Sequence, residues 1–227
     1  MAFAQVANVG KLSTDNNTAV TASIDTTGAA LLVAFVAHDK GSAVAPTDSK
    51  SNTWTAGTAY ETAGAMRVQM YYVIAPTVGS GHTFTLTSTG NYPGIGVVAY
   101  SVGNTPAVYD QVNGAPSNSA LTLATGSITP SAANAVVLTA MTHYTRSTAF
   151  DCDSPFATED ISLPTTANAY GIGVSDEIQT TATARNPTWT DANDFGANEM
   201  AVTIVSFIET VAGGGGRANF LTLLGVS

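Results

Sequence analysis

The stretch Ala30-Leu31-Leu32-Val33-Ala34-Phe35-Val36-Ala37-His38 decides how this chain folds, because a second version of it stands 105 residues later. That version reads Ala135-Val136-Val137-Leu138-Thr139-Ala140-Met141-Thr142-His143. Each version follows a similar short run, which is Thr21-Ala22-Ser23-Ile24 before the first and Thr125-Gly126-Ser127-Ile128 before the second. A long apolar run that returns with its own leader sequence indicates an internal duplication.

Two further pairs of segments extend the duplication toward the end of each copy. Thr83-Phe84-Thr85 returns after 105 residues as Thr188-Trp189-Thr190. Val98-Ala99-Tyr100-Ser101 returns after 107 residues as Val205-Ser206-Phe207-Ile208. Since the pieces recur in the same order at nearly constant spacing, the sequence predicts two copies of one β unit.

Short runs of β-branched and aromatic residues, bounded by Gly, Pro, Asn, Asp and Ser, predict strands throughout both copies. Leu31–Val36 and Val136–Ala140 are apolar on both faces, which predicts central strands covered on each side, by a further layer or by a neighbouring subunit. Asn113-Gly114 predicts a turn. We expect seven strands per copy: Ala4–Val9, Ala19–Ile24, Ala30–His38, Thr53–Tyr60, Met66–Ala75, His82–Ser88 and Ile95–Val102, then Val108–Val112, Leu121–Ile128, Ala135–Tyr144, Phe156–Ile161, Tyr170–Ile178, Pro187–Thr190 and Met200–Thr210.

These signals together predict an all-β protein, an antiparallel, jelly-roll-like β-sandwich built from two internal repeats and followed by a flexible C-terminal tail. We expect residues 1–105 to form the first repeat, residues 106–210 the second, and residues 211–227 the tail. Whether the repeats form one sandwich or two stays open at this level.

The tail combines a hinge with an apolar end. Four consecutive glycines, Gly213–Gly216, lose too much entropy on ordering to lie inside a strand or helix. Large apolar side chains follow, each worth about 1.5–3 kcal/mol when fully buried. We expect them to dock on a neighbouring subunit together with Arg217; the alternative is that the tail folds back on its own domain. The docking residues are Arg217, Phe220, Leu221, Leu223 and Leu224.

Composition limits the partners of this protein. Of 227 residues 44% are hydrophobic and only 10% are charged, against about a quarter in an average soluble protein. Sixteen acidic and seven basic side chains give a net charge of −9, which repels phosphate backbones and anionic membranes. We therefore expect no nucleic-acid and no membrane partner, but copies of the same chain and other proteins of an assembly.

The start of the chain carries no export signal. Met1-Ala2-Phe3-Ala4-Gln5 lacks a basic region followed by a long apolar one, and no apolar run reaches the roughly 20 residues needed to cross a bilayer. The single cysteine, Cys152, excludes an intrachain disulfide. We expect synthesis in the cytoplasm without secretion.

No catalytic or cofactor signature is present, so we predict a protein that is not an enzyme and needs no cofactor. The chain has no Gly-x-Ser-x-Gly elbow, and Asp151 and Asp153 flank Cys152, which raises a thiol pKa by repulsion between like charges. Gly94-Ile95-Gly96-Val97 and Gly171-Ile172-Gly173-Val174 lie inside β runs. This predicts small residues on one strand face that make room for a crossing aromatic side chain or backbone segment, and not a nucleotide loop.

Metal ligation is not predicted either. His38, His82 and His143 lack the spacing of a transition-metal site and are expected to be satisfied histidines at strand ends or in a loop. Oxygen-rich turns offer the ligands that calcium needs, but Asp and Asn also favour turns because their side chains cap the backbone. These turns contain Asp15-Asn16-Asn17, Asp151 with Asp153, and Asp191 with Asn193 and Asp194.

The aromatic residues indicate an alternative function, which is glycan binding. Trp54, Tyr60 and Tyr92 are candidates for ring faces that contact a glycan, although aromatic residues of a sheet more often form core or cross-strand pairs.

A resemblance to a known group of β-sandwich repeats rests on four segments. They are Thr47-Asp48-Ser49-Lys50-Ser51-Asn52-Thr53-Trp54, Met66–Ala75, His82–Thr87 and Val97–Tyr100. An Asp-Ser…Asn-Thr-aromatic turn before a strand, with later Thr-aromatic-Thr and Ala-Tyr-Ser strands, resembles a β-sandwich repeat of bacterial surface proteins and phage virion proteins. Asp153-Ser154-Pro155-Phe156 in the second copy lacks the Asn-Thr pair.

The resemblance implies a non-enzymatic bacteriophage virion component, a capsid decoration or a tail or fibre accessory protein, that acts through contacts between subunits. It would be made in the host cytoplasm and reside in the virion as a homo-oligomer or as part of a larger assembly. The alternative is a carbohydrate-binding β-sandwich module that adsorbs to host glycans.

Overall fold

The computed structural model describes residues 3–13, 17–39, 45–64, 66–88, 93–103, 106–144, 149–162, 170–191 and 198–210. Within these ranges every regular element is a β-strand and every strand pairing is antiparallel. The predicted all-β, antiparallel fold is therefore confirmed.

The first half forms a five-stranded sheet in the order β1-β8-β3-β6-β5 and a three-stranded sheet in the order β2-β7-β4. Apart from β5 and β6, neighbouring strands in these sheets are not consecutive in the chain, as in a jelly roll. The strands are β1 (Phe3–Leu12), β2 (Thr18–Val20), β3 (Leu31–Asp39), β4 (Thr47–Asp48), β5 (Thr55–Glu61), β6 (Met66–Ile74), β7 (Phe84–Thr87) and β8 (Gly94–Val102).

The second half repeats this topology strand for strand. Its sheets run β9-β16-β11-β14-β13 and β10-β15-β12, and two isolated bridges, Ile24 to His82 and Ile128 to Arg185, occupy equivalent places. The strands are β9 (Ala107–Ala120), β10 (Thr122–Ala124), β11 (Ala135–Tyr144), β12 (Phe150–Cys152), β13 (Ala157–Ser162), β14 (Tyr170–Gln179), β15 (Thr188–Asp191) and β16 (Asn198–Glu209).

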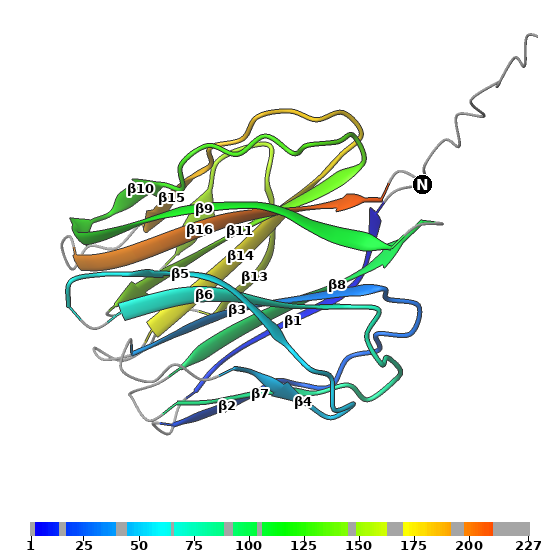
Figure 1. Cartoon of the computed structure of the whole chain (residues 1–227). Coiled ribbons are helices and arrows are strands. Elements are labelled where there is room, and N and C mark those ends of the chain that lie inside the picture. The colour runs from blue at the N-terminus through cyan, green and yellow to red at the C-terminus, as the bar shows by residue number, and fades with distance from the viewer. Residues whose placement is uncertain are drawn as a thin grey trace, which may run out of the picture.

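The four sheets stack as four layers, with the two five-stranded sheets in the middle (Figure 1). Each half has its own core between its two sheets, and a third core joins the halves between the five-stranded sheets. Leu32 and Val36 point into the core of the first half, whereas Val33 and Phe35 point into the shared core. A further layer of the same chain thus covers the second face of the central strands.

The halves meet through an approximate two-fold arrangement. β1 lies against β13 and β5 against β9, while β8 lies against β14 and β6 against β16. Since β1 corresponds to β9 and β5 to β13, each half presents the same face to the other, as the subunits of a two-fold dimer do. Buried polar contacts also cross this junction. In one of them the Tyr100 hydroxyl donates a hydrogen bond to Asp176 Oδ2 at 2.5 Å.

All fourteen expected strands coincide with strands of the structure or with the isolated bridges that extend them, but two short strands, β4 and β12, were not expected. The turn predicted at Asn113-Gly114 is wrong, because both residues lie within β9 opposite Ile204 and Thr203. A Cβ at Gly114 would lie 2.5 Å from the Tyr60 ring, so this glycine makes room for a side chain of the other half.

Gly94 and Gly96 in β8 and Gly173 in β14 make room for nearby side chains and backbone, as predicted. A Cβ at Gly96 would lie 2.6 Å from Val174 Cγ2, and one at Gly94 would lie 2.9 Å from the Tyr170 carbonyl oxygen, both in the other half. A Cβ at Gly173 would lie 2.9 Å from the Trp189 ring. These glycines let the sheets approach closely.

Candidate functional site

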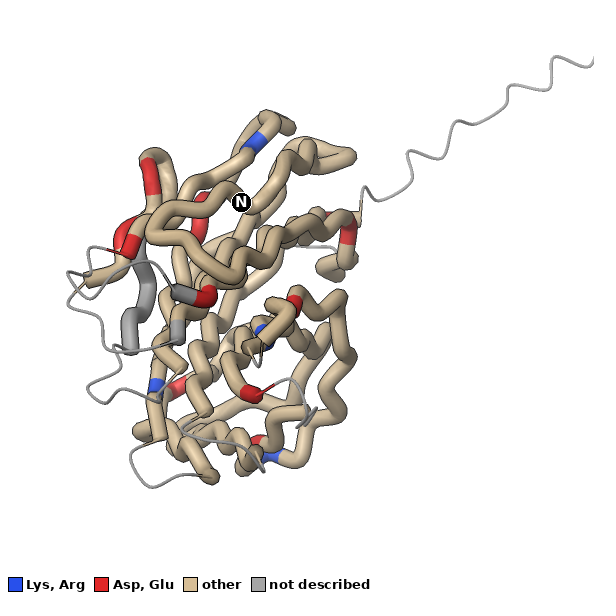
Figure 2. Tube along the Cα trace, turned by 90° about the vertical axis from the view of Figure 1, so that its left-hand side faces the viewer, with Lys and Arg blue, Asp and Glu red and all other residues tan. Residues whose placement is uncertain are grey.

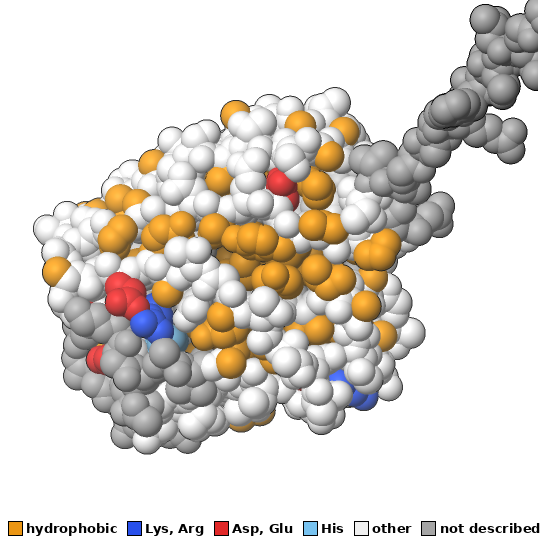
Figure 3. Space-filling model, in the orientation of Figure 1, with side chains coloured by type: hydrophobic (Ala, Val, Ile, Leu, Met, Phe, Trp, Pro, Cys, Tyr) orange, Lys and Arg blue, Asp and Glu red, His pale blue; other side chains and the backbone are white. Residues whose placement is uncertain are grey.

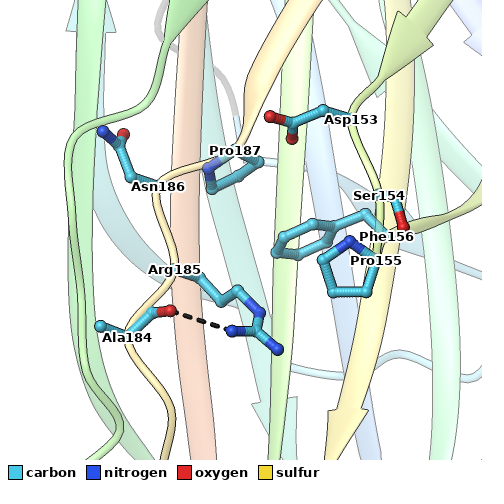
Figure 4. A pocket seen from close by; sticks show the side chains of 8 residues that line it. All are labelled: Asp153, Ser154, Pro155, Phe156, Ala184, Arg185, Asn186 and Pro187. Atoms are coloured by element: carbon cyan, nitrogen blue, oxygen red, sulfur yellow. Dashed lines mark hydrogen bonds between the residues drawn. The ribbon is translucent and has the colours of Figure 1, made fainter.

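A pocket of about 170 Å³ opens in the second half, between the β12–β13 turn and the connection from β14 to β15. Figure 4 shows the turn residues on one side and the connection on the other, with the Arg185 side chain extending across toward the turn. Phe156 and Pro187, both buried, supply apolar surface, while Asp153 and Asn186 are exposed and polar. The Asp153 and Arg185 side chains point into the space between the two segments, whereas the Asn186 side chain points away from the turn (Figure 4).

The polar groups of this pocket are held in place by neighbours. Arg185 Nε and one terminal nitrogen each lie 2.5 Å from a different Glu177 oxygen. This pairing raises the pKa of Arg185; burial pushes the pKa of Glu177 upward, but hydrogen bonds from Arg185 and Gln179 hold it below its usual value. Asp153 Oδ1 accepts a hydrogen bond from the Thr188 amide at 3.0 Å.

The equivalent corner of the first half is filled by its own side chains. Asn52 donates through Nδ2 to the Thr77 carbonyl at 3.0 Å and accepts from the Thr77 amide at 2.7 Å, and Lys50 Nζ donates to the Ser80 carbonyl at 3.0 Å. Six residues, 49–54, separate β4 from β5, whereas four, 153–156, separate β12 from β13. The shorter turn of the second half provides no counterparts of these contacts.

Asp48 holds the longer turn together. Its buried carboxylate accepts hydrogen bonds from the Lys50 amide at 2.8 Å, the Asn52 side chain at 3.1 Å and the Trp54 indole at 2.9 Å, and His82 Nε2 lies 3.0 Å away. Burial pushes the pKa of Asp48 upward, but the hydrogen bonds from His82, Lys50, Trp54 and Asn52 outweigh it and lower the pKa. The Asp-Ser…Asn-Thr-aromatic motif is thus a structural turn.

Thr26, His82 and Asp48 form a chain of contacts in the order hydroxyl, imidazole and carboxylate, which is also the order of groups in a hydrolase catalytic triad. The other ring nitrogen of His82, Nδ1, lies 2.9 Å from Thr26 Oγ1. That hydroxyl also hydrogen-bonds to the amide and the carbonyl of Gly79, at 3.1 and 3.2 Å, and both Thr26 and His82 are fully buried. A substrate has no access to this hydroxyl, so the arrangement stabilises the corner.

The other two histidines are buried at equivalent strand ends. His38 Nδ1 lies 2.6 Å from the Asp39 carbonyl oxygen, and His143 Nδ1 lies 2.7 Å from Asp191 Oδ2 without hydrogen-bond geometry. Among the described residues, Nε2 of neither ring has a hydrogen-bond partner. All three histidines thus lie in a loop or at a strand end with a polar partner beside the ring, as expected.

The described residues contain no group of three or more His, Cys, Asp or Glu side chains placed to hold a metal ion. Of the oxygen-rich turns, Asp151 and Asp153 lie on either side of Cys152 at the end of β12 and Asp191 ends β15. Asp15, Asn16, Asn193 and Asp194 lie outside the described residues.

The three candidate glycan residues do not come together. The Trp54 ring packs edge-on against Phe84 with centroids 6.1 Å apart, and its indole nitrogen is used by Asp48. Tyr60 lies over Gly114 at the junction of the halves, and Tyr92 lies outside the described residues. Sequence reasoning missed the pocket of the second half, although the loss of the Asn-Thr pair there marked a changed turn.

An apolar seam lies at the surface where the two halves meet. It consists of partly exposed side chains that pack on the shared core, and Figure 3 shows the apolar band along the junction. Tyr72 and Tyr109 stack across it with ring centroids 5.4 Å apart. Charged residues are scattered along the trace (Figure 2). The apolar seam comprises Tyr60, Tyr72, Ile74, Val102, Tyr109 and Val112.

The predicted docking residues of the tail, Arg217, Phe220, Leu221, Leu223 and Leu224, lie outside the described residues. The described part of the chain contains no helix with the length and apolar character needed to cross a bilayer. Comparison with protein-family models, curated proteins and solved structures finds no match. The fold and the side-chain chemistry therefore carry the functional argument.

Proposed function

We propose that this protein is a non-enzymatic bacteriophage virion component, a capsid decoration or a tail or fibre accessory protein, that acts through contacts between subunits. The observation that carries the proposal is the apolar seam at the surface of a body with few charged residues. Aromatic residues are enriched at the centre of protein interfaces and charged residues are depleted there. Three tyrosines among the six seam residues give it that character.

The partner of the seam, in this proposal, is the C-terminal segment of a neighbouring copy. Strand β16 ends at Glu209, and the Thr210 amide donates to the Pro106 carbonyl at 3.1 Å, next to the start of β9. β9 carries Tyr109 and Val112 of the seam. The six residues 211–216 span at most about 20 Å when extended, so the apolar residues that follow can leave the body and reach an adjacent molecule.

Burial of Phe220, Leu221, Leu223 and Leu224 on the seam supplies the driving force, because each large apolar side chain contributes about 1.5–3 kcal/mol when it leaves water. The loss of translational and rotational freedom opposes the association, so we expect a moderate affinity for a single tail–seam contact. Many such contacts repeated around a particle would together bind much more tightly.

The oligomeric state tests the proposal. Light scattering of the whole chain should give an oligomer, and deletion of Gly213–Ser227 should give a folded monomer. Replacing Phe220, Leu221, Leu223 and Leu224 by Ser should have the same effect, whereas replacing Ala218, Asn219 and Thr222 by Ser should not. A monomeric whole chain, or an oligomer that survives the deletion, would contradict assembly through the tail.

A further inference from the structure

The junction between the halves has two rims. One rim is formed where β5 lies against β9, and the other where β1 lies against β13. Most of the apolar seam lies along the first rim (Figure 3). The approximate two-fold exchanges the rims, because β5 corresponds to β13 and β9 to β1. Each seam residue on the first rim therefore has a counterpart on the second, which the strand registers identify.

The counterparts of the seam residues are mostly polar. Tyr72 is opposite Val33, and Asp176 is opposite Leu138, which stands 105 residues after Val33, so Asp176 takes the place of Tyr72. The same comparison gives one apolar and three polar counterparts, which are Ile178 for Ile74, Asp176 for Tyr72, Gln5 for Tyr109 and Asn8 for Val112. The fold thus does not require an apolar rim, and this character belongs to one side of the molecule.

The charged side chains on β5, β6 and β9 already have partners. Glu61 forms an ion pair with Arg67. The Asp110 carboxylate accepts hydrogen bonds from the Ser131 and Ser206 hydroxyls at 2.6 and 2.8 Å. A second copy can therefore approach this rim without burying an unpaired charge. Its own seam is a suitable surface to approach, because aromatic and apolar side chains form the centre of protein interfaces.

The C-terminal tail leaves the body beside the seam. The Thr210 amide donates to the Pro106 carbonyl at 3.1 Å, and Tyr109 follows Pro106 after three residues, about 10 Å along an extended strand. Phe220, the first large apolar residue of the tail, is ten residues from Thr210 and reaches at most about 35 Å from it. A neighbouring seam within this reach must lie close to the seam of the molecule that donates the tail.

We propose that two copies of this chain pair about a two-fold axis with their seams facing each other, and that each seam binds the tail of the other copy. The inference rests on the proposed docking of the tail on a neighbour and adds the geometry of that partner. Both tails leave beside their seams, so an arrangement that brings the second seam within reach of the first tail also brings the first seam within reach of the second tail. The exchange is reciprocal and closes at two copies, as an isologous contact does. Once one tail has docked, the second binds at an effective concentration in the millimolar range.

Crosslinking of the whole chain tests the reciprocal exchange. In a Cys152→Ala background, Ala218→Cys places a thiol in the tail and Val112→Cys places one in the seam. A short bismaleimide should join an equimolar mixture of these two variants into a covalent dimer. The variant that carries both changes should also stop at the dimer, because the two contacts close on each other. Asn8→Cys, at the counterpart of Val112 on the polar rim, should give at least about tenfold less dimer than Val112→Cys, since no docked tail raises the local thiol concentration there.

The failure of the pairing can be told from the failure of tail docking. A ladder of covalent trimers and larger species from the double variant would overturn the two-fold pairing and leave the docking intact, because it shows a head-to-tail chain. Crosslinked monomers alone, no crosslinked product, or equal yields from Val112→Cys and Asn8→Cys would contradict the docking of the tail on a neighbouring seam as well. Thermal unfolding of each variant controls for misfolding, and light scattering before crosslinking should give twice the mass of the chain.

Discussion

At the scale of single residues, the Asp48 carboxylate accepts hydrogen bonds from Lys50, Asn52 and Trp54 and lies beside His82. Asp48→Ala should destabilise the protein by about 3–5 kcal/mol, because it leaves His82 and the Trp54 indole buried without their acceptor. Urea unfolding measures this loss. Asp153→Ala, at the corresponding turn of the second half, removes one hydrogen bond on an exposed residue and should cost about 1 kcal/mol. Equal losses would contradict the different roles of the two turns.

The pKa of Asp48 also predicts how stability depends on pH. A carboxyl whose pKa is lowered by folding stabilises the protein fully above its unfolded pKa of about 3.9, and this contribution is lost as pH falls through the lower native pKa. Stability should therefore fall below about pH 4, and Asp48→Asn, which has no such proton to bind, should show a smaller fall over the same range. Unfolding midpoints in urea at stepped pH values test this; parallel curves would contradict it.

Cys152 should be chemically inert in the folded protein. Burial, followed by the charge of Asp153, raises the pKa of this thiol to about 12. At pH 8 only about 1 in 10,000 molecules then carries the reactive thiolate. Labelling with a disulfide reagent should be negligible in the native protein and complete in denaturant, and rapid native labelling would contradict this.

At the scale of elements, close contact between β8 and β14 depends on glycine. Gly96→Ala should destabilise the protein by about 1–3 kcal/mol, because the new Cβ would clash with Cγ2 of Val174. The β-branched side chain of Val174 has little rotational freedom with which to avoid the clash. In Gly96→Ala with Val174→Ala, the smaller side chain relieves the clash, so the double variant should be more stable than the sum of the single changes predicts. Additive losses in a double-mutant cycle would contradict the contact.

Strand β9 shows why one element was mispredicted. Asn-Gly favours a two-residue hairpin when only neighbouring residues decide. Here Asn113 Nδ2 donates to the Ser127 carbonyl at 3.1 Å, and Gly114 lies under the Tyr60 ring. Partners 14 residues away and in the other half outweigh the local preference and keep the strand extended.

At the scale of the whole molecule, the shared core should make the halves unfold together. Calorimetry is expected to show one transition with a ratio of van't Hoff to calorimetric enthalpy near one, because separating the halves exposes Leu31, Val33 and Phe35 of the first and Val136 and Leu138 of the second to water. Two resolved transitions would show that each half is stable alone. A variant such as Val33→Asp should lower the single transition without dividing it.

The order of residues by itself determined the β class, the duplication and the strands that carry apolar runs, because alternation, turn residues and repetition are local signals. His38 and His143 were placed at equivalent strand ends on the same grounds. Only the tertiary structure decided which partner covers the second face of Leu31–Val36, that Asn113-Gly114 is extended, and that one corner is filled by Asn52 while its counterpart is open. These outcomes depend on contacts between residues that are distant in the chain. The energies of these contacts exceed the local conformational preferences, and no short stretch of sequence reveals which residues will meet.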